Sequence, residues 1–245
     1  MELLIVSGHS SGLGRALFEA AQGSDRVVLG ISRRSLGSSG ARVAEISLDL
    51  ASPAPWEESL DRICQKWQAP WRRVVLINNA GSALPVGPTA TLEPAAIIAA
   101  MQLNVVAPLR LFRWILQKFP ETPQRLVAIS SGAATKAYPS WAVYCSSKAA
   151  LRMQAQVIAA EMELLQRDVK VLAYEPGVIA TPMQEQIRQI PAQDFPASTR
   201  FRDLHERGEL IDPRDAAQAL LQLLAEPQTA YFKEHRYAHV TEVKK

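Results

Sequence analysis

The stretch Leu3-Leu4-Ile5-Val6-Ser7-Gly8-His9-Ser10-Ser11-Gly12-Leu13-Gly14 decides the fold of the chain. Its first four residues are apolar and partly β-branched, which predicts a strand buried on both faces. The stretch ends in glycines with the spacing Gly-x-x-x-Gly-x-Gly, and residues 15–21 continue as a helical segment. Glycines let a ligand approach the backbone, and the start of a helix offers unpaired N–H groups to a phosphate. Strand, glycine-rich turn and helix in this order predict a dinucleotide site.

The rest of the chain repeats the alternation of strand and helix. This alternation predicts a single α/β domain over residues 1–245, a Rossmann-type doubly wound parallel sheet of about seven strands with helices on both faces. The apolar runs that predict strands are 3–6, 26–32, 43–48, 73–77, 125–130, 169–174 and 237–240. Helical spacing of apolar residues predicts long helices at 56–68, 93–119, 141–166 and 213–224.

Composition limits the classes of function. The chain has 245 residues, 48% of them hydrophobic and 21% charged, with a net charge of +3 and a pI near 8.9. Basic residues form only short pairs, so no nucleic-acid partner is expected. The N-terminus lacks the features of a signal peptide, and no apolar run has the length of a membrane span. We therefore expect a cytoplasmic protein without a membrane partner. Two widely separated cysteines predict reduced thiols and no metal site.

Two arginines follow the second predicted strand, where a dinucleotide site contacts the adenosine ribose. An acidic residue there binds the 2′-hydroxyl of NAD, whereas arginine suits the 2′-phosphate of NADP. Arg33 and Arg34 therefore favour NADP(H), with a solvated loop as the alternative. Asp49 closes the third strand and either contacts the adenine amino group or merely ends the strand. Asn78-Asn79-Ala80-Gly81 follows the fourth strand and predicts a wall beside adenine and ribose, or only a turn.

A tyrosine and a lysine lie four residues apart in Tyr144-Cys145-Ser146-Ser147-Lys148, so they share one face of a helix. An ammonium beside a phenol favours the phenolate and lowers the tyrosine pKa from its reference of about 10. Tyr144 is then an acid/base group near neutral pH, with the Ser131 hydroxyl beside it. By itself the spacing arises by chance, and an ordinary amphipathic helix is the simpler interpretation until a structural context is found.

Two further segments depart from the regular pattern. The amide of Asn104 lies among apolar residues inside the predicted helix at 93–119, which Pro108 interrupts. Asn104 either hydrogen-bonds locally and kinks the helix or holds a water in a site. Residues 178–208 are polar, contain three prolines and carry short helical pieces. We predict that this segment is a mobile lid over a substrate pocket.

Together these features resemble the short-chain dehydrogenase/reductase family, over essentially the whole chain. The resemblance is carried by Gly8-x-x-x-Gly12-x-Gly14, Asp49, Asn78-Asn79-Ala80-Gly81, Asn104, Ser131, Tyr144-x-x-x-Lys148 and Pro176-Gly177 with Thr181. Each is weak alone, but all occur in order and at the expected strand ends. His9 and Ser7 stand where the family often has Ala and Thr, and neither change is expected to cost the fold.

The resemblance implies a role for each of these positions. Tyr144 would protonate a carbonyl oxygen as hydride leaves the nicotinamide, and Ser131 would orient the same oxygen. Lys148 would lower the Tyr144 pKa and hold the nicotinamide ribose. Asn104 would anchor a water that links Lys148 to solvent, and Ser130 is a weaker candidate than Ser131. The residues implied in binding NADP(H) are Gly8, Ser10, Ser11, Gly12, Leu13, Gly14, Arg33, Arg34, Asp49, Leu50, Asn79, Ala80, Gly81, Tyr144, Lys148, Pro176, Gly177, and, at the carboxamide end, Val178 and Thr181.

Within the family, residues 171–184 and 237–240 are similar to sepiapterin reductases and bacterial benzil reductases. Sepiapterin reductases carry an acidic residue after such a tail, whereas Thr241 stands there in this chain with Glu242 next, which argues against a pterin. We therefore expect an NADPH-dependent reductase of a ketone or diketone. The alternatives are an alcohol or 3-oxoacyl-type dehydrogenase of the same family, or a non-catalytic NADP-sensing regulator that would have no need of the acid/base residues. Family members often pair through their long helices, so a homodimer or homotetramer is expected.

Overall fold

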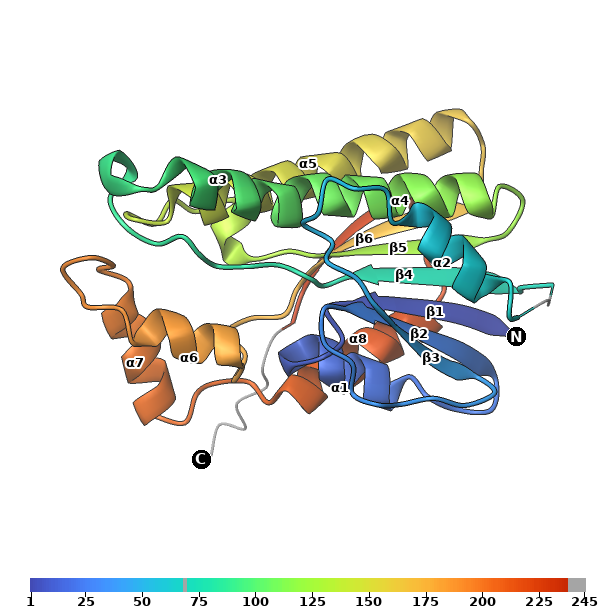
Figure 1. Ribbon diagram of the computed structural model, residues 1–245, viewed down its shortest axis with the longest axis horizontal. Coiled ribbons are helices and arrows are strands. Elements are labelled where there is room, and N and C mark those ends of the chain that lie inside the picture. The colour runs from blue at the N-terminus through green and yellow to red at the C-terminus, as the bar shows by residue number, and fades with distance from the viewer. Residues whose placement is uncertain (68–69, 238–245) are drawn as a thin grey trace.

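One parallel sheet forms the centre of the molecule (Figure 1). The computed structural model describes residues 1–67 and 70–237, and within them seven strands pair in the order β3-β2-β1-β4-β5-β6-β7. The strands are β1 (Glu2–Ser7), β2 (Arg26–Ser32), β3 (Val43–Ser47), β4 (Arg73–Asn78), β5 (Gln124–Ile129), β6 (Val169–Glu175) and β7 (Phe232–Arg236). The predicted fold class is confirmed.

Helices cover both faces of the sheet. On one face lie α2 (Glu57–Cys64), α3 (Pro94–Met101), α4 (Ala107–Lys118) and α5 (Ala142–Leu164), and on the other lie α1 (Gly12–Ala20) and α8 (Pro213–Ala225) (Figure 1). Alternate side chains of β1 enter opposite cores: Leu3 and Ile5 pack under α4 and α5, while Leu4 and Val6 pack under α1 and α8. A strand buried on both faces must be apolar throughout, which is why the Leu3–Val6 run has no polar alternation.

The order of the strands creates a crevice between β1 and β4. The chain leaves β1 toward β2 and leaves β4 toward β5, so the connections diverge from this pair of neighbours. In open α/β sheets, ligands bind at such a switch point, outside the carboxyl ends of the strands. The glycine-rich turn follows β1 and Asn79 follows β4, so the fold brings both predicted segments to the same place.

The long helix predicted at 93–119 has a break that the sequence pattern misplaced. Pro108 lies inside α4 and does not end it, and the irregularity is a π-helical turn at Gln102–Val106, just before α4. A proline ring clashes with the carbonyl of the residue four positions earlier, which is Asn104 here. The wider π turn, centred on Asn104, relieves that clash and lets the helix continue.

Within the described residues the sheet ends with β7 at Phe232–Arg236, a strand that the sequence pattern did not predict. Most side chains of β7 are charged or polar, as suits an edge strand, so they form no apolar run. The strand predicted at 237–240 falls mostly on residues 238–240, which lie outside the described part of the chain. In the predicted lid, the short helical pieces are α6 (Pro182–Arg188) and α7 (Ser198–Glu206). Both lie beyond the carboxyl ends of the strands (Figure 1).

One helical segment of the described residues, Pro94–Lys118, is long and apolar enough to cross a membrane by length and composition alone. The core helix of a soluble protein passes the same test. Leu111, Phe112 and Ile115 of this segment are buried against the sheet, whereas Ile98 and Leu109 are exposed. Both cysteines are free, and no group of His, Cys, Asp and Glu in the described ranges has the arrangement of a metal site.

Candidate active site

A cleft of about 900 Å³ opens along the carboxyl edge of the sheet. Its walls come from the turn after β1, the loops after β2, β3 and β4, the segment between β5 and α5, and the α6–α7 region. Most residues predicted to bind the cofactor line it: Gly8, Ser10, Ser11, Gly12, Leu13, Arg33, Arg34, Asp49, Leu50, Asn79, Ala80, Gly81, Tyr144, Lys148, Pro176, Gly177, Val178 and Thr181. Gly14 and Asn104 do not line the cleft and act from behind it.

The glycine-rich turn forms one wall of the cleft, and its glycines leave backbone open to a ligand. Gly8 and Gly12 have φ values of +71° and +54°, a conformation that favours glycine. A Cβ on Gly8 would lie 2.9 Å from the Ala80 Cα, and a Cβ on Gly14 only 2.1 Å from the Gly8 oxygen. Gly14 therefore allows α1 to pack closely behind the turn. This backbone cradle ends at the start of α1, whose N–H groups no side chain of the described residues caps, so it fits a dinucleotide pyrophosphate.

The turn after β1 and the loop after β4 are held together by Ser7 and Asn79. The Ser7 hydroxyl accepts hydrogen bonds from the backbone N–H groups of Asn79 and Ala80, both at 3.0 Å. The Asn79 amide donates back to the carbonyl oxygens of Ser7 at 3.0 Å and Gly8 at 3.3 Å. Asn79 thus fixes the shape of the cradle through backbone contacts. A serine at position 7 supplies the hydroxyl that this arrangement needs.

At the far end of the cleft, Arg33 and Arg34 leave β2 with exposed side chains. The Ser32 hydroxyl donates to the Arg34 carbonyl at 2.5 Å, which turns the chain away from the sheet. Asp49 lies two residues beyond the end of β3, and its carboxylate accepts the N–H of Ala51 at 3.0 Å. Both segments therefore reach the side of the cleft where a dinucleotide site contacts adenosine.

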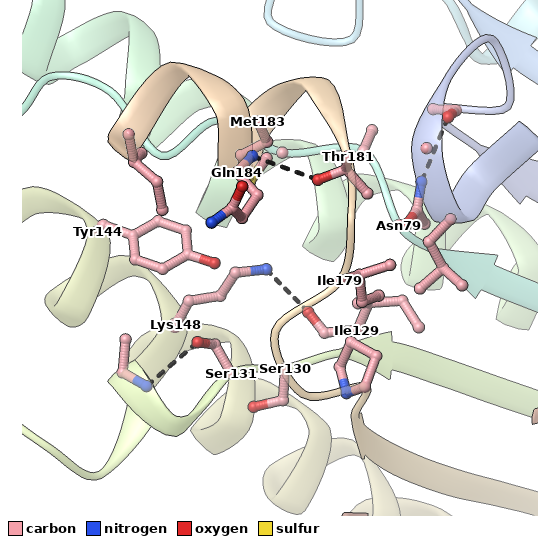
Figure 2. Close-up of a pocket in the computed structure, with 18 of the residues that line it drawn as sticks. Asn79, Ile129, Ser130, Ser131, Tyr144, Lys148, Ile179, Thr181, Met183 and Gln184 are labelled. Carbon is pink, nitrogen blue, oxygen red and sulfur yellow. Dashed lines mark hydrogen bonds between the residues drawn. The ribbon is translucent and has the colours of Figure 1, made fainter. Parts of the chain in front are cut away.

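The proposed acid/base residues meet at the centre of the cleft (Figure 2). Tyr144 and Lys148 come from the first two turns of α5, and Ser131 comes from the segment after β5. The Lys148 ammonium is buried and donates to the carbonyl oxygen of Ile129 at 2.8 Å. The Ser131 hydroxyl accepts the N–H of Ala133 at 3.2 Å, so it caps a short 3₁₀ turn and is held in place. Its neighbour Ser130 also lines the cleft.

Burial dominates the pKa values of this group. It raises the pKa of Tyr144 to about 12, against the opposing effect of a hydrogen bond with the Ser131 side chain. It lowers the pKa of the Lys148 ammonium to about 8. Burial removes water from both groups and so disfavours both charged forms in the protein alone. That Lys148 lowers the Tyr144 pKa stays a prediction. At neutral pH the phenol is protonated, as a proton donor must be.

Asn104 is a structural anchor behind the centre of the cleft. Its amide donates to the Ser82 carbonyl at 2.8 Å and to the Ser147 hydroxyl at 3.1 Å, and its oxygen accepts the Ser82 N–H at 2.9 Å. These partners lie 22 and 43 residues away in sequence, so the side chain of Asn104 bonds outside its own turn, and its role in holding a water stays a prediction. The contacts tie the loop after β4 to α5 one residue before Lys148.

The segment after β6 closes the cleft from the other side. Gly177 has φ of +79°, and Ile179 pairs with Ile211 in an isolated parallel bridge. The hydroxyl of Thr181 accepts the N–H of Gln184 at 3.3 Å and caps α6 (Figure 2). A Cβ on Gly12 would lie 2.9 Å from the Thr181 Cγ2, so the two walls of the cleft nearly touch there.

An aromatic wall that the sequence pattern did not single out lines the substrate side of the cleft. Trp141 stacks on Tyr144 with ring centroids 4.4 Å apart and donates its indole N–H to the Ala83 carbonyl at 2.7 Å. Tyr138 meets Trp141 edge-on at 5.7 Å, and Phe201 of α7 lies 6.0 Å from it. The position of Trp141, three residues before Tyr144, is the signal that the sequence did contain, since residues three apart are neighbours on a helix.

The geometry of the cleft agrees with the comparisons to known proteins. The sequence model of the family described as short chain dehydrogenase matches residues 2–191. The chain belongs to the short-chain dehydrogenase family. It is an oxidoreductase of that family, and NAD(P)(H) is the class of cofactor that the family uses.

Benzil reductases and sepiapterin reductases are among the relatives of this short-chain dehydrogenase. The benzil reductase ((S)-benzoin forming) of Bacillus cereus is 33% identical over 235 residues, covering 91% of this chain and 94% of the relative. The sepiapterin reductase of Bos taurus is 33% identical over 242 residues, covering 91% of this chain and 89% of the relative.

Solved structures show the same fold. The KRED1-Pglu enzyme superposes with a TM-score of 0.81 at 29% identity, covering 95% of this chain and 100% of that one. A short-chain dehydrogenase/reductase of Saccharomyces cerevisiae gives a TM-score of 0.81 at 25% identity, covering 96% of each chain. ElxO, solved with NADP bound, gives a TM-score of 0.73 at 20% identity and shows the fold alone.

Proposed function

We propose that this protein is an NADPH-dependent carbonyl reductase in which Tyr144 donates the proton. The observation that supports this most strongly is the position of the Tyr144 phenol, the Ser131 hydroxyl and the Lys148 ammonium on one cleft with the glycine cradle. A non-catalytic NADP-sensing regulator would need the cradle but not the three groups.

The chain's own groups act at the carbonyl oxygen of the substrate. A bound nicotinamide cofactor supplies the hydride, with its two electrons, to the carbonyl carbon. Ser131 donates a hydrogen bond that orients the oxygen, and Tyr144 transfers its phenolic proton to that oxygen to give the alcohol. Lys148, with a pKa of about 8 against about 12 for Tyr144, is the stronger acid. Its ammonium is therefore the thermodynamic source for reprotonation of the phenolate.

The substrate is proposed to be a bulky ketone or diketone with an aromatic group. The name of the Bacillus cereus relative describes reduction of a diketone, benzil, to (S)-benzoin. The wall formed by Trp141, Tyr138 and Phe201 suits an aromatic ring, because ring pairs contribute beyond the area that they bury. The argument against a pterin rests on Thr241 and Glu242, which lie outside the described residues.

The choice of NADPH over NADH is proposed from Arg33 and Arg34. Both line the cleft beyond the end of β2, where the adenosine ribose is bound in this fold. An arginine there pairs with a phosphate by charge and by paired N–H donors. An acidic residue, which would select the 2′-hydroxyl of NADH, is absent from positions 33 and 34.

We further propose a cytoplasmic homodimer or homotetramer that pairs through the layer of α3, α4 and α5. Large apolar side chains are exposed on this layer, at Ile98, Leu109, Met153 and Val157. Exposed large apolar side chains on one layer favour an interface between copies, because their contact with water is unfavourable. Light scattering during gel filtration would give the mass, and a monomer that persists at high protein concentration would contradict the proposal.

The test of the function is Tyr144→Phe, followed by NADPH oxidation with a panel of aromatic ketones, diketones and a pterin. We expect kcat to fall by about a thousandfold, since the proton donor is removed. The Kd for NADPH, from fluorescence titration, should change by no more than about twofold, because one hydroxyl of a large contact surface is lost. The matched control is Tyr231→Phe, which removes a hydroxyl far from the cleft and should leave both values unchanged. Turnover of Tyr144→Phe near that of the wild type would overturn the proposed mechanism.

A further inference from the structure

A histidine inside the glycine-rich turn makes a contact that the dinucleotide cradle itself does not need. His9 lies between Gly8 and Ser10 but is fully buried, with 0% of its side chain exposed. Its Nε2 atom lies 2.7 Å from the Oε2 atom of Glu45 on β3, whose side chain is 5% exposed. The two residues are 36 positions apart in sequence. The pair therefore connects the pyrophosphate cradle to the strand at the edge of the sheet.

The fold leaves a specific space for the imidazole ring. A Cβ on Gly30 of β2 would lie 2.5 Å from the His9 Cγ, so any larger residue there would collide with the ring. On the other side, the ring of Phe18 from α1 has its centroid 4.7 Å from the His9 ring. Glycine below and phenylalanine beside the ring fix its position. The charged partner of the ring is Glu45.

The carboxylate of Glu45 also holds the loop that follows Arg33 and Arg34. One oxygen accepts the backbone N–H of Leu36 at 2.6 Å, and the other accepts that of Ser38 at 2.5 Å. Although burial raises its pKa, the hydrogen bonds from His9, Leu36, Ser38 and Ser35 together lower the pKa of Glu45 to about 2. The carboxylate is therefore charged throughout the physiological range and binds the loop through charge-assisted hydrogen bonds.

This arrangement has two consequences for an anion bound by the loop. The hydrogen bonds to Leu36 and Ser38 limit where the chain can carry the guanidinium groups of Arg33 and Arg34. The hydrogen bond between His9 and Glu45 also ties this loop to the glycine-rich turn, so both segments of the dinucleotide site are held in one arrangement.

We propose that His9 and Glu45 are positioning residues for the 2′-phosphate of the dinucleotide: the pair fixes the Arg33–Arg34 loop and thereby strengthens the preference for NADPH over NADH. The inference rests on the NADPH preference proposed above. It assigns a reason to the histidine in the turn and to the glycine at position 30. Neither His9 nor Glu45 lines the cleft, so they act through the loop.

The test uses ligands that differ in the phosphate. Binding of 2′,5′-ADP and of 5′-AMP is measured by titration calorimetry for the wild-type protein, His9→Ala, Glu45→Gln and Arg33→Ala. We expect His9→Ala and Glu45→Gln to weaken 2′,5′-ADP about tenfold, since hydrogen bonds to a charged group are lost. Binding of 5′-AMP should stay within about twofold, because the cradle itself is intact. In steady-state assays, KM for NADPH should rise while kcat at saturating NADPH is kept.

Two further variants separate positioning from general stability. His9→Gln keeps an N–H donor in the same space and should recover most of the 2′,5′-ADP affinity that His9→Ala loses. The matched control is Glu19→Gln, which removes a carboxylate from the exposed pair of Arg15 and Glu19 on α1 and should change neither ligand. If His9→Ala does not fold, the test rests on Glu45→Gln, because this substitution keeps the shape of the side chain.

The outcomes distinguish this inference from the function on which it rests. Loss of 2′,5′-ADP binding in Arg33→Ala but not in His9→Ala or Glu45→Gln overturns the positioning role and leaves the NADPH assignment standing. Equal weakening of both ligands in the two variants also overturns it, because the pair would then only support the fold. No change of either ligand in Arg33→Ala removes both the assignment and the inference.

Discussion

The two walls of the cleft are built from different materials. The cofactor wall, at the turn after β1 and the loop after β4, is made of backbone, glycines and amides within a few residues of a strand end. The substrate wall is made of side chains from the segment before α5 and from α6 and α7, which come together only in the folded chain. The cofactor wall is therefore suited to one class of cofactor. On the substrate wall, exchange of a single side chain can change which substrate is bound.

The difference shows where tolerance to mutation is expected. Where glycines form the wall, an added Cβ has little room: at Gly8 and Gly14 it meets backbone atoms, and at Gly12 it meets the Thr181 side chain. A side-chain wall can lose or gain volume at a moderate cost in stability, since neighbouring side chains adjust. Residues at the junction of the walls, such as Lys148 and Asn104, are expected to show both stability and activity effects.

The largest effect is expected from Gly14→Ala in the cofactor wall. The added Cβ would lie 2.1 Å from the Gly8 oxygen, so α1 or the turn must move. We expect a loss of about 3 kcal/mol in the free energy of unfolding, measured in urea, together with weaker NADPH binding. The control is Gly40→Ala, where nothing lies within 4 Å, and the expected change is below about 0.5 kcal/mol. Equal losses of unfolding free energy in Gly14→Ala and Gly40→Ala would show that close backbone packing does not restrict position 14.

The next effect is expected at the junction, from Asn104→Ala. The substitution leaves the Ser82 N–H and carbonyl and the Ser147 hydroxyl without their partner. We expect a loss of about 2 kcal/mol in unfolding free energy, because unmade hydrogen bonds of partly buried groups are costly. The rate of reduction should fall as well, since the loop after β4 is no longer tied to α5. Gln102→Ala in the same π turn is the control, and a similar loss there would assign the effect to the turn itself.

The pH dependence of reduction tests the chemistry between the walls. The pKa of Lys148 is about 8, so its ammonium is present below pH 8 and lost above it. We expect kcat for reduction to be level below pH 7 and to fall about tenfold per unit above pH 8, as protons for Tyr144 become scarce. The Tyr144 phenol itself, with a pKa of about 12, stays protonated over this range. A level profile to pH 9.5 would show that Lys148 does not supply the proton.

The smallest effect is expected from Met183→Ala in the substrate wall. Met183 lies at the start of α6, lines the cleft and packs against the apolar cluster that contains Tyr144. We expect KM for a bulky aromatic ketone to rise about fivefold, since roughly 1 kcal/mol of apolar contact is lost. The Kd for NADPH should not change. Met153→Ala on the exposed face of α5 is the matched control. If Met183→Ala changes the Kd for NADPH and not the KM for the ketone, Met183 belongs to the cofactor wall and the assignment is wrong.

Prediction from sequence succeeded where the signal is local. The order of strands and helices, the glycine turn and the Tyr144–Lys148 spacing follow from residues within about one turn or one strand of each other. Prediction was less accurate where the structure of a segment depends on a residue far away in the sequence. The contacts of Asn104 depend on Ser82 and Ser147, and β7 forms by pairing with β6. No periodicity in the chain contains that information.

The sequence by itself determined that a strand, a glycine turn and a helix begin the chain. A strand buried on both faces needs a continuous apolar run and a left-handed turn needs glycine, and both patterns are visible within a few residues. It also placed Ser131, Tyr144 and Lys148 near a strand end. Only the tertiary structure decided that Trp141 stacks on Tyr144, that burial moves the pKa of Tyr144 up, and that His9 meets Glu45. Burial and charge contacts are properties of groups brought together by folding, so residues far apart in the chain define them jointly.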